Sequence, residues 1–319
     1  MADLSRFEHG APTPAAAGGT RLKSGSAMER QSPTEPHVYD ARQAFVSPDI
    51  EEADAPGVLA KAKAAGWRSG KLPHPWWRLQ YSAIVQARAG RDAPVDHDGA
   101  ESLVDLDAEP RLQRFSALVA CMLSSQTKDE VTAAAVRRLV AWGLSPQHVV
   151  DTPLPQLEAM LKPVGFYVRK ASYLQRTSEI LLAKYQGDIP RTAAELMALP
   201  GIGPKMAYLA LHVAFSADEC AAAGIETHIV VDVHVHRISQ RLGWASGKTP
   251  EQTREQLESW LPHEHWRQIN PMLVGFGQQV CKAKNPACSE CPVASVCPHA
   301  RRSGGAAGVK RARNSDAVE

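Results

Sequence analysis

The sequence predicts an all-α protein, and three features carry this prediction. From about Leu112 onwards, apolar residues recur at helical spacing through most of the chain. Segments with the alternating pattern of a strand are scarce, and residues 228–231, although rich in β-branched side chains, stand alone. Short polar loops separate the periodic stretches, and several of them offer a residue suited to cap a helix: Thr152, Thr192, Asp232 and Thr249.

The first two expected helices combine an apolar run with clear boundary residues. Residues 111–123 form a mostly apolar run that ends before Ser124 and Ser125. Residues 129–142 begin with two acidic side chains, which favour the positive end of the helix dipole, and end at Gly143. The same periodicity predicts helices over residues 154–161, 169–184, 192–198, 205–215, 233–242 and 249–260.

The two ends of the chain have a different composition. Residues 1–74 are rich in Ala, Pro, Gly and Ser and poor in large apolar side chains, so we expect a disordered extension. Residues 301–319 carry five basic and two acidic side chains and are expected to form a basic disordered tail. Residues 310–313 of this tail are a candidate nuclear signal, so the expected location is the nucleus, with the mitochondrion as a second compartment. No apolar run is long enough to span a membrane, so no membrane partner is expected.

A glycine-containing hairpin, LPGIGPK, lies at residues 199–205 between two expected helices. Gly201 and Gly203 permit backbone conformations closed to other residues and leave room for a ligand. The next helix would start at Pro204 or Lys205, and the free amides of its first turn suit a phosphate group. From this pattern alone, an ordinary tight turn remains the alternative.

Lys205 and Asp232 are candidate catalytic residues. Lys205 would stand at the positive end of a helix dipole, in a helix whose apolar residues predict burial, and both effects favour the neutral, nucleophilic amine. The alternative is a surface lysine that contacts phosphate. Asp232 is placed to cap the following helix, and its carboxylate could also assist the lysine.

Four of the six cysteines crowd into one C-terminal segment, separated by six, two and five residues: Cys281, Cys288, Cys291 and Cys297. Without a secretion signal, such crowding indicates metal binding rather than disulfides. Four thiolates suit either zinc or an iron–sulfur cluster. The wide gaps fit a cluster loop better, but the spacing alone leaves both open. Cys121 and Cys220 are expected to be ordinary structural thiols.

Taken together, these motifs resemble the endonuclease III family of DNA glycosylase/lyases, and in particular its eukaryotic branch. The resemblance rests on the LPGIGPK hairpin followed by VDVHVHR, on MLSSQTKD at residues 122–129 and on DAPVD at residues 92–96. It covers residues 75 to 298 approximately. Two features depart from the family: Val233 stands where threonine is usual, and residues 218–227 contain an expected insertion.

The resemblance implies the helix-hairpin-helix DNA glycosylase fold, with two helical domains and a DNA cleft between them. One domain, residues 108–225, would contain the hairpin. The other would combine residues 75–107 with 226–300 and would carry a four-iron, four-sulfur (4Fe-4S) cluster on the four clustered cysteines. Lys205 and Asp232 would face each other across the cleft.

The resemblance also implies a function: a bifunctional DNA glycosylase and abasic-site lyase of base excision repair, acting as a monomer on double-stranded DNA that carries an oxidised pyrimidine or an abasic site. Lys205 would attack the sugar, Asp232 would support the developing charge, and β-elimination would cut the strand. The residues expected to contact DNA are Gln126, in the space left by a flipped base, Phe166, as a wedge, and Leu199, Gly201 and Gly203, at the backbone. For Phe166, a place in the hydrophobic core is the alternative.

Two other functions share part of this pattern. An adenine-mispair glycosylase of the same superfamily has the hairpin and the cluster but lacks a lysine at the position of Lys205. A non-catalytic helix-hairpin-helix protein would bind DNA without needing the pair of Lys205 and Asp232. Lys205 therefore distinguishes the expected enzyme from both alternatives.

Overall fold

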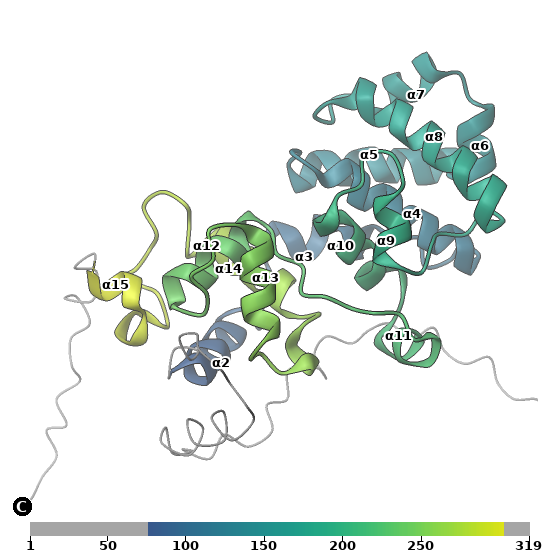
Figure 1. Ribbon diagram of the computed structural model, residues 1–319. Coiled ribbons are helices and arrows are strands. Elements are labelled where there is room, and N and C mark those ends of the chain that lie inside the picture. Colours follow the sequence, from purple (N-terminus) through teal and green to yellow (C-terminus); the bar gives the residue numbers. More distant parts are fainter. Residues whose placement is uncertain (1–75, 303–319) are drawn as a thin grey trace, which may run out of the picture. The chain divides into compact units, whose positions relative to one another are not determined.

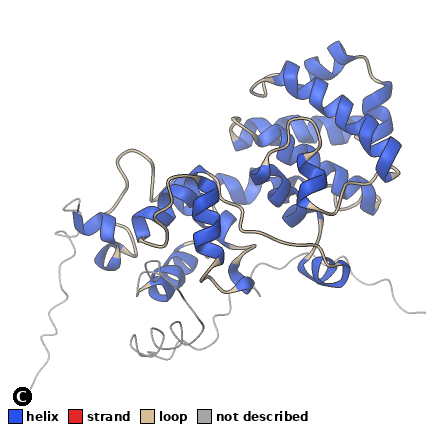
Figure 2. Ribbon diagram, in the orientation of Figure 1, coloured by secondary structure: helices blue, strands red, loops and turns tan. Residues whose placement is uncertain are grey.

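The computed structural model describes residues 76–302. The expected N-terminal extension and residues 303–319 of the expected basic tail lie outside this range. Between residues 76 and 302 every regular element is a helix and no strand forms (Figures 1 and 2). The prediction of an all-α fold is confirmed, and the β-prone residues 228–231 run as an irregular segment.

The first hydrophobic core surrounds helix α4 (Pro110–Ser124). Every residue of α4 from Phe115 to Leu123 is buried, as expected for a helix that is apolar on all sides. The helices that share this core are α5 (Asp129–Trp142), α6 (Pro146–Asp151), α7 (Leu154–Leu161), α8 (Tyr167–Tyr185), α9 (Ala193–Met197), α10 (Pro204–Ala214) and α11 (Ala217–Ala223).

A second core lies among helices from both ends of the described chain: α2 (Trp77–Ala87), α12 (Val233–Leu242), α13 (Pro250–Glu258), α14 (Ile269–Gln279) and α15 (Pro298–Arg302). Two 3-10 helices belong to this region, η3 (His263–His265) and η4 (Ala294–Val296). The buried Gln80 side chain ties α2 to the rest, because its Nε2 donates to the carbonyls of Leu242 (3.3 Å) and Val296 (3.0 Å) and its Oε1 accepts from the Trp244 indole (2.6 Å).

A short helix, α3 (Pro94–Asp98), contacts elements of both cores, α5 and α14, and the 3-10 helix η2 (Ala100–Leu103) follows it. The division into two domains, with the bounds expected from the sequence, remains a prediction. Helix α15 extends to Arg302, two residues into the segment expected to be the basic tail. None of the helices among residues 76–302 has the length and apolar character needed to cross a membrane.

The expected helix caps are mostly confirmed. Thr192, Asp232 and Thr249 each accept a backbone hydrogen bond at the start of a helix. The expectation for Thr152 was wrong, because its hydroxyl donates back to the His148 carbonyl (2.7 Å) at the end of α6. The expected insertion at 218–227 contains most of α11, whose first turn is fixed by a reciprocal pair of hydrogen bonds between Ser216 and Glu219.

Candidate functional site

The hairpin at residues 199–203 joins α9 to α10. Leu199 is buried, and its carbonyl accepts from the Ile202 amide at 3.3 Å. Gly201 lies exposed at φ +78°, and a Cβ there would stand 2.3 Å from the Tyr173 ring, so only glycine fits. Gly203 caps α10 with open space beside it, and no side chain of residues 76–302 bonds the first-turn amides of α10. These amides are therefore available to an anion such as a backbone phosphate.

Lys205 occupies the second position of α10 and is exposed. The expectation of a buried lysine was wrong, because the buried stripe of α10 begins only at Ala207, beyond the first turn. The apolar sequence therefore buries the body of the helix, while its first residues project from the core. An exposed amine in this position can reach a bound molecule, which a buried amine could not do.

Asp232 caps α12 through one carboxylate oxygen. Its Oδ1 accepts from the backbone N–H groups of His234 and Val235, both at 2.8 Å, and the residue is half-buried. Such a cap fixes the orientation of the carboxylate while leaving Oδ2 free for other contacts. Beside it, Val233 is 70% exposed, so the departure from threonine places an apolar side chain on the surface next to this carboxylate.

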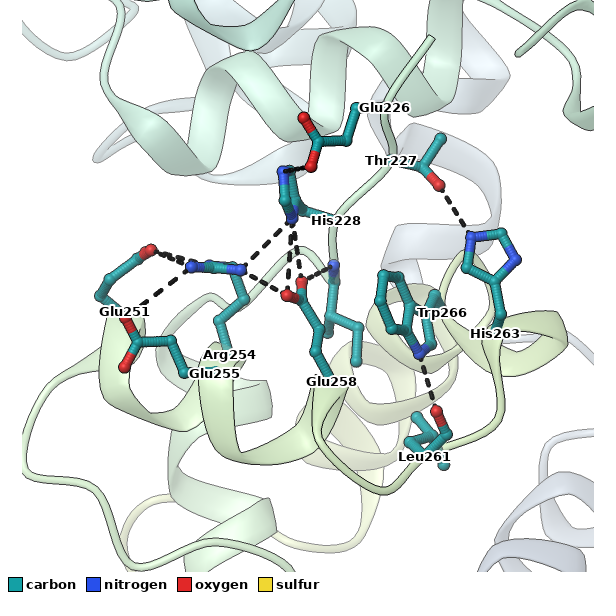
Figure 3. A network of polar contacts seen from close by, with 11 residues as sticks. Glu226, Thr227, His228, Glu251, Arg254, Glu255, Glu258, Leu261, His263 and Trp266 are labelled. Atoms are coloured by element: carbon teal, nitrogen blue, oxygen red, sulfur yellow. Dashed lines mark hydrogen bonds and ion pairs between the residues drawn. The ribbon is translucent and has the colours of Figure 1, made fainter. Parts of the chain in front are cut away.

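The segment that leads from α11 to Asp232 is fastened by polar contacts (Figure 3). The amide of Ile229 donates to Glu258 Oε1 at 2.8 Å, and the carbonyl of Val230 accepts from Asn270 Nδ2 at 2.9 Å. Arg254 in turn forms ion pairs with Glu258 and, at 2.6 Å, with Glu251. These contacts hold the irregular segment against α13 and α14. Asp232 is therefore anchored by this segment before it and by its own cap on α12 after it.

Asp129, in the first turn of α5, was expected only as a helix-dipole residue, but the structure gives it further partners. Its Oδ2 accepts from Gln278 Nε2 on α14 at 2.8 Å. Burial raises the pKa of Asp129, and the Gln278 hydrogen bond and the positive charges of Lys205 and His234 oppose this rise. The feature of the sequence that could have pointed to this role is the position of Asp129 directly after the SSQTK segment.

The ring of His234 links the two expected catalytic residues electrostatically. Burial lowers the pKa of His234, the charge of Asp232 opposes this effect, and the charge of Lys205 adds to it. No hydrogen bond or ion pair joins Lys205 directly to Asp232 among residues 76–302. The charge of Lys205 thus lowers the pKa of both Asp129 and His234, and the charge of Asp232 raises that of His234.

Gln126 and Phe166 lie on two turns that touch each other. Both residues are exposed and both have left-handed backbones, with φ values of 50° and 58°. The amide of Gly165 donates to Thr127 Oγ1 at 3.2 Å, and a Cβ on Gly165 would stand 2.7 Å from the Gln126 carbonyl oxygen. Residues other than glycine adopt this conformation rarely, and such positions cluster at functional sites.

The four clustered cysteines line one pocket together with the apolar side chains of Leu242, Phe276, Val280 and Val293. None of them forms a disulfide. Arg241 holds the loop, because its guanidinium donates to Cys281 Sγ (3.3 Å) and to the Lys282 carbonyl (2.7 Å). Burial raises the pKa of Cys288, and that of Cys291 to about 11, so ligand formation must displace protons there.

The donor set in this pocket suits a cluster better than a single ion. Among residues 76–302, no three Cys, His, Asp or Glu side chains are arranged to hold one metal ion. A 4Fe-4S cluster keeps each cysteine on a different iron, so its ligands stand farther apart than those of one zinc ion. The apolar pocket brings four thiols together as candidate ligands, and Arg241 donates to one of them.

Comparisons with known proteins decide the family. The HhH-GPD superfamily of base excision DNA repair proteins matches residues 119–263, and the iron–sulfur binding domain of endonuclease III matches residues 281–297. Endonuclease III-like protein 1 of Bos taurus is 49% identical over 227 residues, which cover 70% of this chain and 72% of that protein. This chain belongs to the endonuclease III family.

Relatives and solved structures agree with this assignment. The Mus musculus Endonuclease III-like protein 1 is 46% identical over 70% of this chain and 73% of its own. A structure described as a trapped endonuclease III–DNA covalent intermediate has a TM-score of 0.60 at 27% identity, covering 73% of this chain and all of that one. A non-covalent endonuclease III–DNA complex has a TM-score of 0.58 at 28% identity, covering 71% of this chain and 97% of that one.

Membership in the endonuclease III family confirms the fold and the cofactor that the resemblance implied. The chain has the helix-hairpin-helix glycosylase fold, is a base excision repair protein, and carries a 4Fe-4S cluster rather than zinc. The match at residues 281–297 runs from Cys281 to Cys297. The roles of the individual site residues remain predictions.

Proposed function

We propose that this endonuclease III family member is a bifunctional DNA glycosylase and abasic-site lyase that removes oxidised pyrimidines from double-stranded DNA. The observation that carries the proposal is the exposed Lys205 amine in the first turn of α10, directly after the glycine hairpin. A base excision glycosylase needs no lysine at this point, whereas a lyase needs an accessible amine. The trapped covalent complex between a related endonuclease III and DNA supports a covalent step.

The reaction begins with DNA held by its backbone. The free amides after Gly203 and the exposed turn at Gly201 bind phosphate without reading sequence. The damaged base leaves the stack, because its sugar cannot be reached inside the duplex. Gln126 and Phe166, exposed on adjacent turns, enter the duplex: Gln126 fills the vacated space and Phe166 acts as a wedge.

The chemistry then passes through an imine. The Lys205 amine forms a bond to the sugar C1′ as the glycosidic bond breaks, and the electron pair departs with the base, which takes up a proton. The Asp232 carboxylate, oriented by its cap, stabilises the positive charge that develops on the sugar. The C1′–O4′ bond then breaks, the ring oxygen takes a proton from the attached amine to become a hydroxyl, and a protonated imine joins Lys205 Nζ to C1′. Loss of the C2′ proton from this imine breaks the bond from C3′ to the phosphate oxygen, which leaves with the bonding electron pair, and the strand is cut by β-elimination.

The cluster stabilises the C-terminal loop. Cys281, Cys288, Cys291 and Cys297 are the proposed ligands, since all four line the pocket. When bound, the cluster supplies a covalent cross-link between parts of a loop that has little regular structure. Arg237 and Arg241 of α12 both donate to the carbonyl of Cys281, so the same loop supports the helix that Asp232 begins.

We expect the protein to act as a monomer, in the nucleus and, as a second compartment, the mitochondrion.

Reduction by borohydride tests the mechanism. On a duplex with one thymine glycol, the wild type should become covalently joined to DNA when borohydride is present. Lys205→Gln should abolish the joining and keep DNA affinity, because the hairpin amides remain. Lys184→Gln, which changes an exposed lysine on α8, is the matched control and should trap normally. Undiminished trapping by Lys205→Gln would place the nucleophile at another amine. Release of thymine glycol without trapping would leave a glycosylase without lyase activity, and no base release at all would favour one of the two alternative functions.

A further inference from the structure

Lys170 is a buried lysine that the proposed reaction leaves without a role. It lies in the first turns of α8 and is 7% exposed. Its Nζ donates three hydrogen bonds, to the carbonyls of Leu123 (2.7 Å) and Ser125 (2.6 Å) and to Thr127 Oγ1 (3.1 Å). No carboxylate pairs with it among residues 76–302. Burial lowers its pKa to about 8, the consequence of a cation held in an apolar setting.

The three acceptors of Lys170 all lie at the C-terminal end of α4 and in the turn that follows it. Leu123 and Ser125 present carbonyls at the negative end of the α4 dipole, where a cation is favoured. Gln126, with its left-handed backbone, lies between two of the residues that Lys170 binds. The ammonium group therefore shapes the turn that presents the Gln126 side chain.

The same lysine belongs to the element that presents Phe166. Phe166 is the residue before α8, and its carbonyl accepts from the Lys170 amide at 3.0 Å. Thr127 completes the link, because its hydroxyl contacts both Lys170 Nζ and the Gly165 amide. Lys170 and Thr127 thus connect the turn at Gln126 with the turn at Phe166.

We propose that Lys170 is a positioning residue that holds the Gln126 turn and the Phe166 turn at a fixed spacing, as one unit that probes DNA. The proposal rests on the proposed function, since it assumes that both side chains enter the duplex. Two strained turns would relax independently if they were not tied together, and side chains that enter neighbouring base steps need a fixed separation. A buried, unpaired cation is costly to the fold, so an apolar residue would serve better if packing were the only role.

The first test compares Lys170→Met with Lys184→Met, the same change on the exposed part of α8. A duplex carries 2-aminopurine opposite a stable abasic analogue, and its fluorescence rises when the partner base is unstacked. Saturating wild type and Lys184→Met should raise the fluorescence, and Lys170→Met should raise it much less. Single-turnover borohydride trapping on duplex abasic DNA should slow by about ten- to a hundredfold in Lys170→Met, the scale of a misplacement near 1 Å. Trapping on single-stranded abasic DNA should be unchanged.

A second variant keeps the proposal testable if Lys170→Met folds poorly. Gly165→Ala retains the lysine, but the added Cβ would meet the Gln126 carbonyl oxygen at 2.7 Å and force the turns apart. It should reproduce the defect on duplex with normal trapping on single strands. Equal losses on both substrates, or no loss on either, would overturn the proposal. If the wild type traps no DNA at all, the proposed lyase fails, while the 2-aminopurine signal still reports on Lys170.

Discussion

Gln278 on α14 donates a 2.8 Å hydrogen bond to Asp129 on α5, across 149 residues of sequence. The other end of the same amide accepts from the Val95 backbone N–H at 3.1 Å. One side chain therefore ties α14 to both α3 and α5, and it does so at the carboxylate that lies within the electrostatic reach of Lys205. Polar groups that bridge packed helices in this way fix the spacing between the helices, which the backbone hydrogen bonds within each helix do not determine.

Gln278→Ala should therefore shift the pH profile of the reaction. The Gln278 hydrogen bond favours the charged form of Asp129, so its loss should raise the pKa of Asp129 further, beyond the effect of burial. The acid limb of the trapping rate should move to higher pH. Gln279→Ala is the matched control, because that side chain bonds Asp92 instead, at 2.7 Å. If the acid limb of the trapping rate does not move in Gln278→Ala, protonation of Asp129 does not control the reaction.

Asp232→Asn should separate base removal from strand cleavage. The amide oxygen of asparagine can still accept from His234 and Val235, so the cap and the fold should survive. Loss of the carboxylate charge should slow release of a damaged base by a factor of about 100 or more, as when one charge-stabilising group is removed elsewhere. On a preformed abasic site the defect should be much smaller. Equal defects on both substrates would contradict the role in base departure.

Gly201→Ala should destabilise the hairpin. At φ +78° a side chain is strained, and the added Cβ would overlap the Tyr173 ring. We expect a loss of about 1–3 kcal/mol in the free energy of unfolding and weaker DNA binding. Gly203→Ala is the matched control, since nothing lies within 4 Å of its Cβ position. Thermal unfolding of the two variants side by side measures the difference, and equal stability would show that the strain is absorbed.

His212 should make the protein sensitive to acid. Burial lowers its pKa from 6.5 to about 3, and its buried Nε2 has no hydrogen-bond partner in the part of the chain that the structure describes. Between pH 6.5 and 3 the unfolded chain therefore binds a proton that the folded chain does not, so stability is full above pH 6.5 and is lost as the pH falls. The slope from this one group approaches about 1.4 kcal/mol per pH unit.

Urea unfolding at pH 7 and pH 5 measures this contribution. His212→Leu should lose less stability than the wild type between the two values, because the buried proton acceptor is gone. His97→Leu, at an exposed histidine, should follow the wild type. A wild type and a His212→Leu variant with parallel pH profiles would show that the ring is protonated in the folded state.

The pocket lined by Cys281, Cys288, Cys291 and Cys297 predicts the iron and sulfide content of the protein. The purified protein should be yellow-brown and contain iron and sulfide, and Cys288→Ser should lose both together with the order of residues 281–297. Cys220→Ser, a buried thiol outside this pocket, should keep the cluster. Elemental analysis of anaerobically prepared protein measures the metal. Stoichiometric zinc without iron would contradict the prediction.

Several elements of the fold followed from local patterns, and others did not. Periodicity placed α5, α7 and α12 within a residue of their observed bounds. The short helices α6 and α11 were not expected, because six or seven residues hold too little periodic pattern and depend on tertiary packing.

The sequence by itself determined the all-α class, the caps at Asp232 and Thr249, the glycine hairpin and the cysteine spacing, because each depends on residues close together in the chain. Only the tertiary structure decided that Lys205 is exposed, since burial depends on which face of α10 meets the core. It alone brought Gln278 to Asp129 and Lys170 to the Gln126 turn. Contacts between residues far apart in sequence are set by the packing of whole helices, and local patterns carry no record of that packing.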